Sequence, residues 1–592
     1  MNYFPCACPL CAAASASGDL PDAPLKPVIG KPISGDYRID ALLETAGMRW
    51  NAGTPLGTAV EVTYSFMTAE PTYGNGDGGT GFQPFSAAQK AAVREIFAQL
   101  SASVNLSFRE VADSEDSYGQ IRFGNNTQAD SAGYAFLPHS DTTDLAGDVW
   151  ISTEYASKMT PGSYEYATLV HEIGHALGLK HPGNYNAGET TTADPDATYL
   201  GRDEDNQNYT VMSYRDAATS EGQQRAGYGL YDMLALQYLY GARSIHTGDA
   251  DVYRYTDDIG RNIVMVQDSG GTQDTIDLSA VSIGAVVNLQ PGALSSAGPA
   301  VSGRRAADNL SIMSGTVIEN LVGTAASDFI TGNAADNRIT SGGGNDDIDG
   351  AAGIDTVVLG GNWKTWKLAT SAGTTTASTP SANVTMSNVE RVQFADLTVN
   401  LGAPARAKAI SAAQLQSIEE LYIAYFNRVP DADGLAYWAD QLKGGLSITQ
   451  IGESFYAAAV QYASLTGYST SMTNADFVRV VYKNVLGRAG ENAPADADVD
   501  YWAGKLADGS ATRGSLVGTM LDSAHSFKGN ASWGWVADLL DNKVMVANYF
   551  AVDNALNYNS VEDSISKGMA LAAAITPTDT AAAIQLIGVP AA

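Results

Sequence analysis

The sequence predicts a multidomain protein with an α/β lobe, an all-β region and a mainly α C-terminal region. Helical and strand patterns alternate from Tyr37 to about Ala242. The stretch from Arg243 to about Leu401 is rich in Gly, Thr, Val, Asn and Asp and reads as short strands, and helical periodicity returns beyond Ala407. A chain of 592 residues is too long for one hydrophobic core, so three or four domains are expected. We place their boundaries at 1–35, 36–243, 244–401 and 402–592.

The first lobe contains clear local signals. Ser86 to Leu100 has apolar residues at helical spacing behind a serine that can cap the helix. The runs VNLSFREV, GQIRFGN and GDVWIST alternate as half-buried strands do. We therefore expect an α/β lobe in which strands of this kind pack beside helices.

The composition limits the class of protein. Apolar residues make up 45% of the chain and charged residues 17%, as in packed domains. The formal net charge of -31 repels nucleic acid and anionic lipid, so we expect no nucleic-acid partner. No run reaches the roughly 18 consecutive apolar residues that a membrane helix needs, so we expect no transmembrane segment.

The N-terminal residues 1–35 are rich in Ala, Pro and Cys and are predicted to be a prosegment. No Lys or Arg precedes Lys26, so the charged start of a secretory signal peptide is missing and ordinary signal-peptide export is not expected. All three cysteines, Cys6, Cys8 and Cys11, lie in this segment. The rest of the chain must be stabilised by core size or metal ions rather than by disulfides.

One stretch predicts a catalytic zinc site. It reads HEIGHALGLKH and fits HExxHxxGxxH. His171 and His175 share a helix face, Gly178 can turn the chain at the helix end, and His181 can supply a third ligand. Three protein ligands leave a fourth position open, and Glu172 can reach water there. A chance HExxH on a core helix would be the better interpretation of five residues alone, but the longer pattern disfavours it.

The residues after this motif carry a family resemblance. Thirty-one residues beyond His181, Met212 stands in NYTVMSYRD, and a Met-turn after this zinc motif resembles the metzincins. The resemblance implies that Met212 forms an apolar floor under the zinc ligands. The tripeptide Met212, Ser213, Tyr214 is similar to that of serralysins and astacins, which implies that Tyr214 binds zinc in the resting enzyme and hydrogen-bonds the oxyanion during turnover.

Further segments resemble serralysins specifically: HPGNYN, AGYAFLP, GDVWIS and YDMLALQYLYGA. One departure is Arg215, where serralysins usually carry Trp, and it leaves the shape of the nearby pocket open. The resemblance implies a metzincin catalytic domain over residues 36–243.

The expected activity is a secreted zinc-dependent endopeptidase. Zinc lowers the pKa of its bound water to about 7, Glu172 moves the proton to the leaving amine, and zinc and Tyr214 stabilise the oxyanion. Protein or peptide substrates would lie extended along an edge strand, for which we select Ala132, Gly133, Tyr134 and Ala135.

Residues 323–358 divide into four nonapeptides. Their sixth positions are Asp328, Asn337, Asp346 and Asp355, and their eighth positions are Ile330, Ile339, Ile348 and Val357. They resemble the RTX nonapeptide of parallel β-rolls, and SGGTQDTID at 269–277 is an additional copy. The resemblance implies that the eighth residues point into the roll and that structural Ca²⁺ lies between alternate repeats, which pairs Asp328 with Asp346 and Asn337 with Asp355. It also implies export by type I secretion machinery that reads a C-terminal signal. A Gly and Asn rich turn ladder without metal is the alternative.

The region from residue 402 contains a duplicated motif, at 421–442 and 481–506. The matching residues are Tyr422, Arg428, Tyr437 and Trp438 in the first copy and Tyr482, Arg488, Tyr501 and Trp502 in the second. It resembles a helical domain of unknown function found in bacterial surface and RTX proteins. The aromatic pairs either bind a cell-surface glycan or S-layer, or pack helices together.

The N-terminal cysteines and the role of the whole chain each allow more than one interpretation. Cys6, Cys8 or Cys11 could fill the open zinc position and keep the enzyme latent, but a local disulfide, an accidental metal-binding tail or an attachment site would also explain them. The chain could also be a calcium-dependent surface or adhesion protein that keeps a protease-like lobe. The intact Glu172 favours the enzyme.

Overall fold

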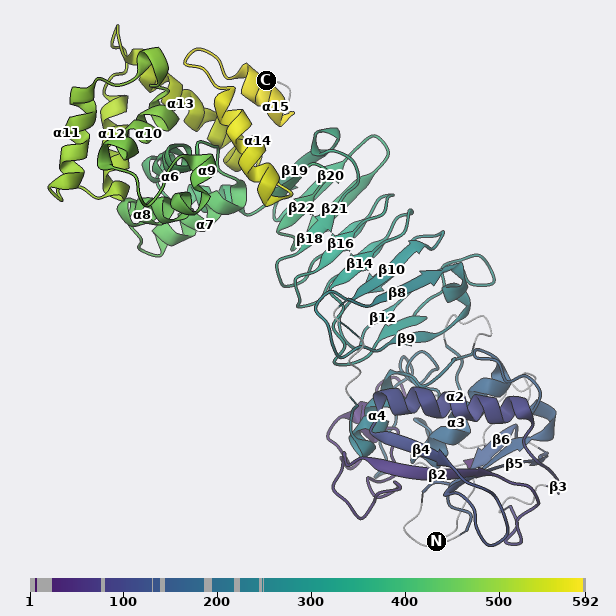
Figure 1. The fold of residues 1–592 in the computed structure, drawn as a ribbon. Helices are drawn as coiled ribbons and strands as arrows, with labels where there is room; N and C mark the ends of the chain where they lie inside the picture. The colour runs from purple at the N-terminus through teal and green to yellow at the C-terminus, as the bar shows by residue number, and fades with distance from the viewer. Residues whose placement is uncertain are drawn as a thin grey trace. The chain divides into compact units, whose positions relative to one another are not determined.

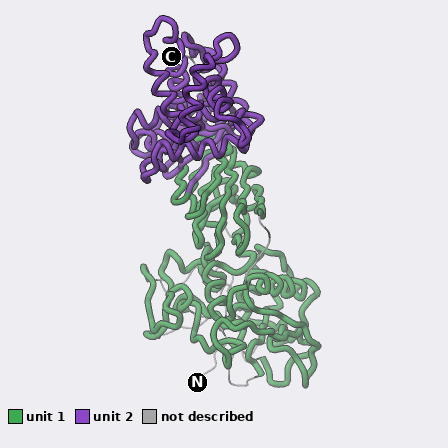
Figure 2. Tube along the Cα trace, turned by 60° about the vertical axis from the view of Figure 1, so that its left-hand side comes forward, with its two compact units in different colours: residues 1–353 green, residues 354–592 purple. Residues whose placement is uncertain are grey.

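The computed structural model divides the chain into two compact units, Met1–Gly353 and Ile354–Ala592 (Figure 2). The division lies inside the predicted repeat region. The structure describes residues 6–7, 24–75, 80–129, 131–138, 144–185, 194–217, 224–243, 248 and 250–588.

The N-terminal part of the first unit is built on one mixed sheet (Figure 1). Its strands follow the order β1-β6-β7-β5-β2-β4, and β3 pairs with β5. β2, β4, β5 and β7 run parallel to one another, whereas β6 is antiparallel to β7 and β3 is antiparallel to β5. The strands are β1 (Cys6–Ala7), β2 (Val60–Phe66), β3 (Thr80–Gln83), β4 (Leu106–Glu110), β5 (Ile121–Thr127), β6 (Gly133–Ala135) and β7 (Asp148–Ser152).

The predicted strands are present, but the prediction that they are half-buried is wrong for β5 and β7. Every residue of β7, and every residue of β5 except Thr127, is buried. Apolar side chains cover both faces of the sheet here, because Val149 and Ile151 join the main core while Trp150 packs in a second cluster with Tyr134. Central parallel strands are commonly buried in this way.

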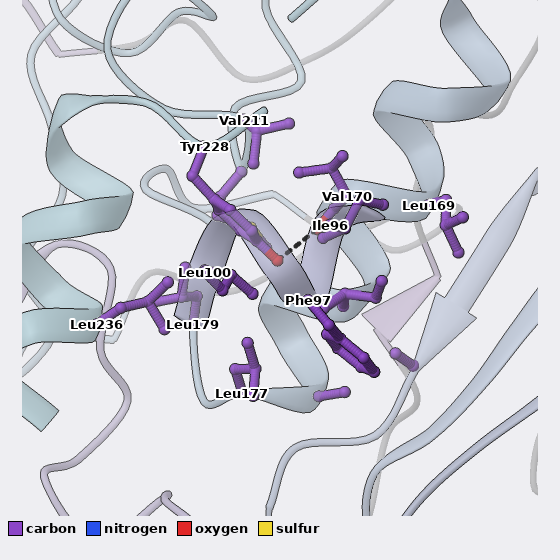
Figure 3. Close-up of a cluster of buried hydrophobic side chains, with 14 of the residues drawn as sticks. Ile96, Phe97, Leu100, Leu169, Val170, Leu177, Leu179, Val211, Tyr228 and Leu236 are labelled. Atoms are coloured by element: carbon purple, nitrogen blue, oxygen red, sulfur yellow. Dashed lines mark hydrogen bonds between the residues drawn. The ribbon is translucent and has the colours of Figure 1, made fainter. Parts of the chain in front are cut away.

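The same part of the chain contains four helices: α1 (Tyr37–Asp40), α2 (Ala87–Ser103), α3 (Tyr164–Ala176) and α4 (Leu230–Tyr240). The predicted helix is confirmed as α2, and Ser86 and Gln89 form the capping box that begins it. Figure 3 shows apolar side chains of α2, α3 and α4 meeting in the core, where the Tyr228 hydroxyl donates to the Val170 carbonyl at 3.0 Å. Each fully buried side chain of this kind contributes about 1.5–3 kcal/mol.

The rest of the first unit is all-β, as predicted. Parallel strands β8, β10, β14 and β16 follow one another in one sheet, and β11, β15 and β17 in another. The bounds are β8 (Val252–Thr256), β9 (Val264–Val266), β10 (Thr275–Ala280), β11 (Val286–Asn288), β12 (Leu294–Ser295), β13 (Leu310–Ile312), β14 (Asn320–Val322), β15 (Phe329–Thr331), β16 (Arg338–Thr340) and β17 (Asp347–Asp349).

The second unit begins with strands and continues as helices. β18, β22, β23 and β24 lie in one sheet and β19, β20 and β21 in another. The bounds are β18 (Thr356–Val358), β19 (Lys367–Ser371), β20 (Thr374–Ser378), β21 (Asn383–Ser387), β22 (Arg391–Gln393), β23 (Leu397–Asn400) and β24 (Leu556–Tyr558). β24 arises from the region predicted to be helical and pairs antiparallel with β23, an element that the sequence pattern did not indicate.

The helices of the second unit confirm the predicted mainly α region. They are α5 (Ala403–Lys408), α6 (Ala412–Phe426), α7 (Ala432–Lys443), α8 (Ile448–Ala459), α9 (Ala463–Thr466), α10 (Asn474–Leu486), α11 (Asp496–Ala507), α12 (Arg513–His525), α13 (Gly534–Asn548), α14 (Val561–Ala573) and α15 (Ala581–Ile587). Within the described ranges, no helix combines the length and apolarity needed to cross a bilayer.

Candidate active site

Helix α3 and the turn after it bring three histidines together. The Ser163 hydroxyl accepts from the Tyr166 amide and caps the start of the helix. Gly178 ends it with φ 106°, where a Cβ would clash with the Met48 carbonyl oxygen. A residue with a side chain would be strained there, so glycine is required for the turn that leads to His181.

The three imidazoles converge on one point. Their Nε2 atoms lie 3.1 to 3.2 Å from one another, close to the roughly 3.4 Å expected for nitrogens on a tetrahedral zinc ion. Each Nδ1 donates to a backbone carbonyl, which directs the Nε2 lone pairs inward. These bonds run from His171 to Val211 at 2.8 Å, from His175 to Leu179 at 2.7 Å and from His181 to Tyr185 at 3.1 Å.

Burial also prepares the histidines as ligands. It holds the pKa of His171 well below its ordinary value and lowers the pKa of His175 to about 4. Both imidazoles are therefore neutral near pH 7, the form that binds metal. The geometry of His171, His175 and His181, and the neutral state of the first two, fit a zinc ion.

Glu172 lies beneath strand β6. It is fully buried, and a Cβ placed on Gly133 would lie 2.9 Å from its Cγ and 3.0 Å from its Oε1. Glycine at position 133 therefore leaves room for the carboxylate. The candidate base therefore follows His171 directly on α3, and its carboxylate lies against the strand selected for substrate.

Strand β6 pairs with β7 on one side and, on the other side, with β1 of the predicted prosegment. Cys6 lies opposite Ala135 and Ala7 opposite Tyr134, in antiparallel register. Of the four residues selected for substrate, Tyr134 offers only its main chain, because its hydroxyl donates to the Asn75 carbonyl at 3.2 Å and its ring is buried. Cys8 and Cys11 lie outside the described residues.

Met212 and Tyr214 flank the histidines. Met212 is fully buried, and its Sδ would lie 2.7 Å from a Cβ placed on Gly174, which is on α3 between two ligands. The Tyr214 ring centroid lies 4.2 Å from that of His181 and 5.9 Å from that of His171. Both residues thus lie next to the histidine cluster.

In the repeats, the eighth positions are core residues and the alternate repeats pair. Ile330 lies opposite Ile348 in the parallel pair β15 and β17. Asp328 and Asp346 are buried, and the Asp328 amide donates to Asp346 Oδ1 at 3.0 Å. Burial raises the pKa of Asp346 to about 6, and its Oδ2 is buried without a hydrogen bond. A cation here would relieve the cost of two buried carboxylates.

The second predicted pair is different. The Asn337 side chain accepts from the Asn333 amide at 2.7 Å and donates to the carbonyls of Ile318 and Glu319 at 3.3 and 3.2 Å. Its amide group therefore serves carbonyls that a cation could otherwise bind. Asp355 lies in the second unit, where its amide donates to Glu390 at 2.7 Å.

Sequence reasoning missed one further acidic cluster. Asp251, Asp268 and Asp274 have oxygens within 4.8 Å of one another and could hold a metal ion. The repeat copy SGGTQDTID was the signal for Asp274, and Gly271 in that copy has φ 85°. Asp251 lies 23 residues away in sequence, so only the fold brings it into the cluster.

The duplicated aromatic residues mostly pack within the helical region. Trp502 Nε1 donates to the Tyr482 hydroxyl at 3.2 Å, and Arg488 lies over the Tyr482 ring at 5.1 Å. Arg428 lies over the Tyr422 ring in the same way at 5.3 Å. Tyr437 and Tyr501 are exposed, at 54% and 59%. The pattern mainly supports helix packing.

Three family models match successive parts of the chain. The family model Matrixin matches residues 80–188, Peptidase M10 serralysin C terminal matches 233–370, and Domain of unknown function (DUF4214) matches 407–459 and 463–529. Among solved structures, myroilysin aligns at 16% identity and a TM-score of 0.22 over 34% of this chain and 97% of that chain, a likeness too weak to support an argument.

Three curated relatives are serralysins or a related protease. The chain is 36% identical to Serralysin of Proteus mirabilis over 49% of this chain and 62% of the relative. It is 34% identical to Metalloprotease AprA of Pseudomonas entomophila over 52% and 66%, and 33% identical to Serralysin G of Dickeya chrysanthemi over 49% and 62%. The chain thus spans somewhat under two thirds of the length of these relatives. In its matched segments, its HExxHxxGxxH helix and its Met212 turn, this chain is similar to the serralysin-like metzincins.

Proposed function

We propose that this protein is a zinc endopeptidase. One observation carries the proposal: three imidazole Nε2 atoms lie within 3.2 Å of one another, beside a buried Glu172 that lies against an edge strand. A zinc ion held by His171, His175 and His181 supplies Lewis-acid polarisation of the scissile carbonyl and makes water at the site more acidic.

The chain's own residues account for the remaining steps. Glu172 accepts the proton of the attacking water and delivers it to the leaving amine. The Tyr214 hydroxyl donates to the developing oxyanion, next to His181. The main chain of β6 pairs with an extended substrate, as edge strands do in peptide recognition.

The test is digestion of an unfolded protein substrate, with the cleaved bonds mapped by mass spectrometry. We expect internal cleavage that stops with a zinc chelator and returns with added zinc. Cleavage confined to the chain ends, or cleavage that a chelator leaves unchanged, would refute the proposal.

We also propose that the protein binds calcium. Residues 323–358 form an RTX roll in which Asp328 and Asp346 hold Ca²⁺, and Asp251, Asp268 and Asp274 hold a further ion. The raised pKa of Asp346 and its buried Oδ2 support the first site. The Asn337 hydrogen bonds argue against a cation at that residue.

Latency of the precursor is supported by the pairing of β1 with β6. In this proposal residues 1–35 are a prosegment that covers the substrate edge until it is removed, with or without a thiol on the zinc. Replacing Cys6, Cys8 and Cys11 by Ser separates the two. A precursor that stays inactive is blocked by strand pairing, and one that becomes active was blocked by a thiol.

The helical region is proposed to place the protease at the cell surface, after export by type I secretion machinery. A cavity of about 550 Å³ in the second unit supports a binding role. Aromatic and polar side chains of the kinds that contact saccharides are part of its lining, namely Phe426, Arg428, Asp431, Tyr462 and Ser564, beside aliphatic residues such as Leu465 and Met569.

Co-sedimentation with cell envelopes tests the binding role. Arg428→Ala and Tyr462→Ala should reduce binding, whereas Tyr437→Ala, an exposed tyrosine outside the cavity lining, should not. Equal binding by all three variants would assign the cavity no role.

A further inference from the structure

A buried carboxylate outside the ligand set connects two parts of the candidate active site. Asp205 is 1% exposed. Its Oδ1 accepts from the Tyr185 hydroxyl at 2.6 Å and from the Ser213 hydroxyl at 2.7 Å. Its Oδ2 accepts from Arg215 Nε at 3.2 Å. One side chain therefore contacts residues on both sides of Tyr214 as well as Tyr185.

The Tyr185 side of this network reaches the third ligand. His181 Nδ1 donates to the Tyr185 carbonyl at 3.1 Å. The Tyr185 ring lies 4.8 Å from the Tyr214 ring and 5.8 Å from the His181 ring, measured between centroids. The Tyr185 ring thus packs against the Tyr214 ring, and Asp205 holds the Tyr185 hydroxyl in place.

The other side of the network fixes the turn itself. The Arg215 amide donates to the Ser213 hydroxyl at 3.1 Å, and the Gln207 amide donates to the Arg215 carbonyl at 3.0 Å. Ser213 and Arg215, the neighbours of Tyr214, are therefore both held by Asp205. Arg215 also balances the charge of this carboxylate, which would be costly to bury alone.

We propose that Asp205 is a positioning residue that sets the Tyr214 hydroxyl for the oxyanion, by clamping Tyr185, Ser213 and Arg215 around it. The inference rests on the proposed peptidase activity. It gives Arg215 a role as the counter-ion of the clamp, in the position where serralysins usually carry Trp. Asp205 acts through Tyr214, so it should matter to turnover more than to zinc or substrate binding.

A double-mutant cycle with Tyr214→Phe tests this coupling. Asp205→Asn and Tyr185→Phe should each lower kcat roughly tenfold, leave KM within about twofold and leave the zinc content unchanged. In the Tyr214→Phe background, the same substitutions should change kcat by less than about twofold, because the hydroxyl they position is already gone. Tyr185→Phe keeps the ring and removes one hydrogen bond, so it serves if Asp205→Asn folds poorly.

The matched control is the neighbouring carboxylate. Glu204 accepts from the hydroxyls of Tyr37 and Tyr231 at 2.7 and 2.6 Å, so it holds two tyrosines as Asp205 holds one tyrosine and one serine. Glu204→Gln should leave kcat within about twofold in both backgrounds. A loss as large as that of Asp205→Asn would mean that any hydrogen-bonded carboxylate of this segment has the same effect.

Equal losses in the wild-type and Tyr214→Phe backgrounds would overturn the inference, and so would loss of zinc from Asp205→Asn. Binding of a phosphinic peptide, whose tetrahedral anion imitates the oxyanion, repeats the cycle by calorimetry without turnover. A wild-type protein that binds this probe but cleaves no peptide would contradict the proposed function alone. A cycle that is additive for the probe would contradict the role of Asp205.

Discussion

The zinc region and the repeat region are prepared for metal in opposite ways. Around His171, each imidazole is already held by a backbone carbonyl, and burial keeps His171 and His175 neutral, so the ligand set is formed without an ion. In the repeats, Asp328 and Asp346 are buried carboxylates with raised pKa values. Metal binding should therefore matter for chemistry in the zinc region and for folding in the repeat region.

The largest effect expected is on turnover in the zinc region. Glu172→Gln should lower kcat about 10³-fold or more while zinc stays bound, because Glu172 acts on water and the imidazoles hold the metal. Turnover and zinc content are measured on the same preparation. Activity within tenfold of wild type would remove Glu172 from the mechanism.

Calcium removal should then separate the two regions. Chelation of calcium should make residues 323–358 sensitive to proteolysis while α2 and α3 keep their helical signal. Asp328→Ala with Asp346→Ala should reproduce this loss, and Asp347→Asn, an exposed neighbour, should not. Equal protease resistance with and without calcium would return the repeats to a turn ladder without metal.

The pH dependence sharpens the same comparison. The pKa of Asp346 is raised in the folded protein, so without calcium its stabilising contribution is fully present below pH 3.8 and is lost as the pH rises through about 6. Bound calcium favours the ionised carboxylate, so calcium affinity should fall as the pH drops below about 6. Calorimetric titration at pH 5 and pH 7 measures this. Equal affinities would exclude Asp346 as a ligand.

A smaller effect is expected at the substrate edge. Gly133→Ala should lower kcat/KM roughly tenfold, because the added Cβ would lie 3.0 Å from Glu172 Oε1 and displace the carboxylate by a few tenths of an ångström. Zinc content should not change. Wild-type kinetics in this variant would place the substrate elsewhere than along β6.

The smallest effect is expected from the helical region. All candidate catalytic residues precede Arg215 in the first unit, so a chain that ends at residue 401 should cleave a short peptide within about twofold of the full chain. Because β24 would no longer cover β23, folding is checked by circular dichroism. A large loss of turnover in a folded, zinc-loaded truncation would show that the regions depend on each other.

The parts predicted from sequence are those that local geometry determines. The i, i+4 spacing of His171 and His175, the turn at Gly178 and the cap at Ser86 each depend on neighbouring residues, so the pattern indicated them directly. The eighth repeat positions were predicted as core for the same reason, because they recur every nine residues.

The features that the sequence did not indicate depend on distant contacts. β24 is a three-residue strand whose extended conformation depends on antiparallel pairing with β23. Asp251 joins Asp268 and Asp274 only through the fold, and Asp205 was one acid among many until Tyr185, Ser213 and Arg215 surrounded it. The full burial of β7 likewise depends on a second apolar cluster over its far face.

Titration of metal-free protein with zinc tests the central claim most directly. Zinc is removed with a chelator while calcium is kept, and peptide hydrolysis and bound zinc are followed together as zinc is added back. The account predicts a folded, inactive protein whose activity rises in proportion to zinc and reaches its plateau at one ion per chain. Full hydrolysis by the zinc-free protein, or a zinc-loaded protein that hydrolyses no peptide, would contradict it.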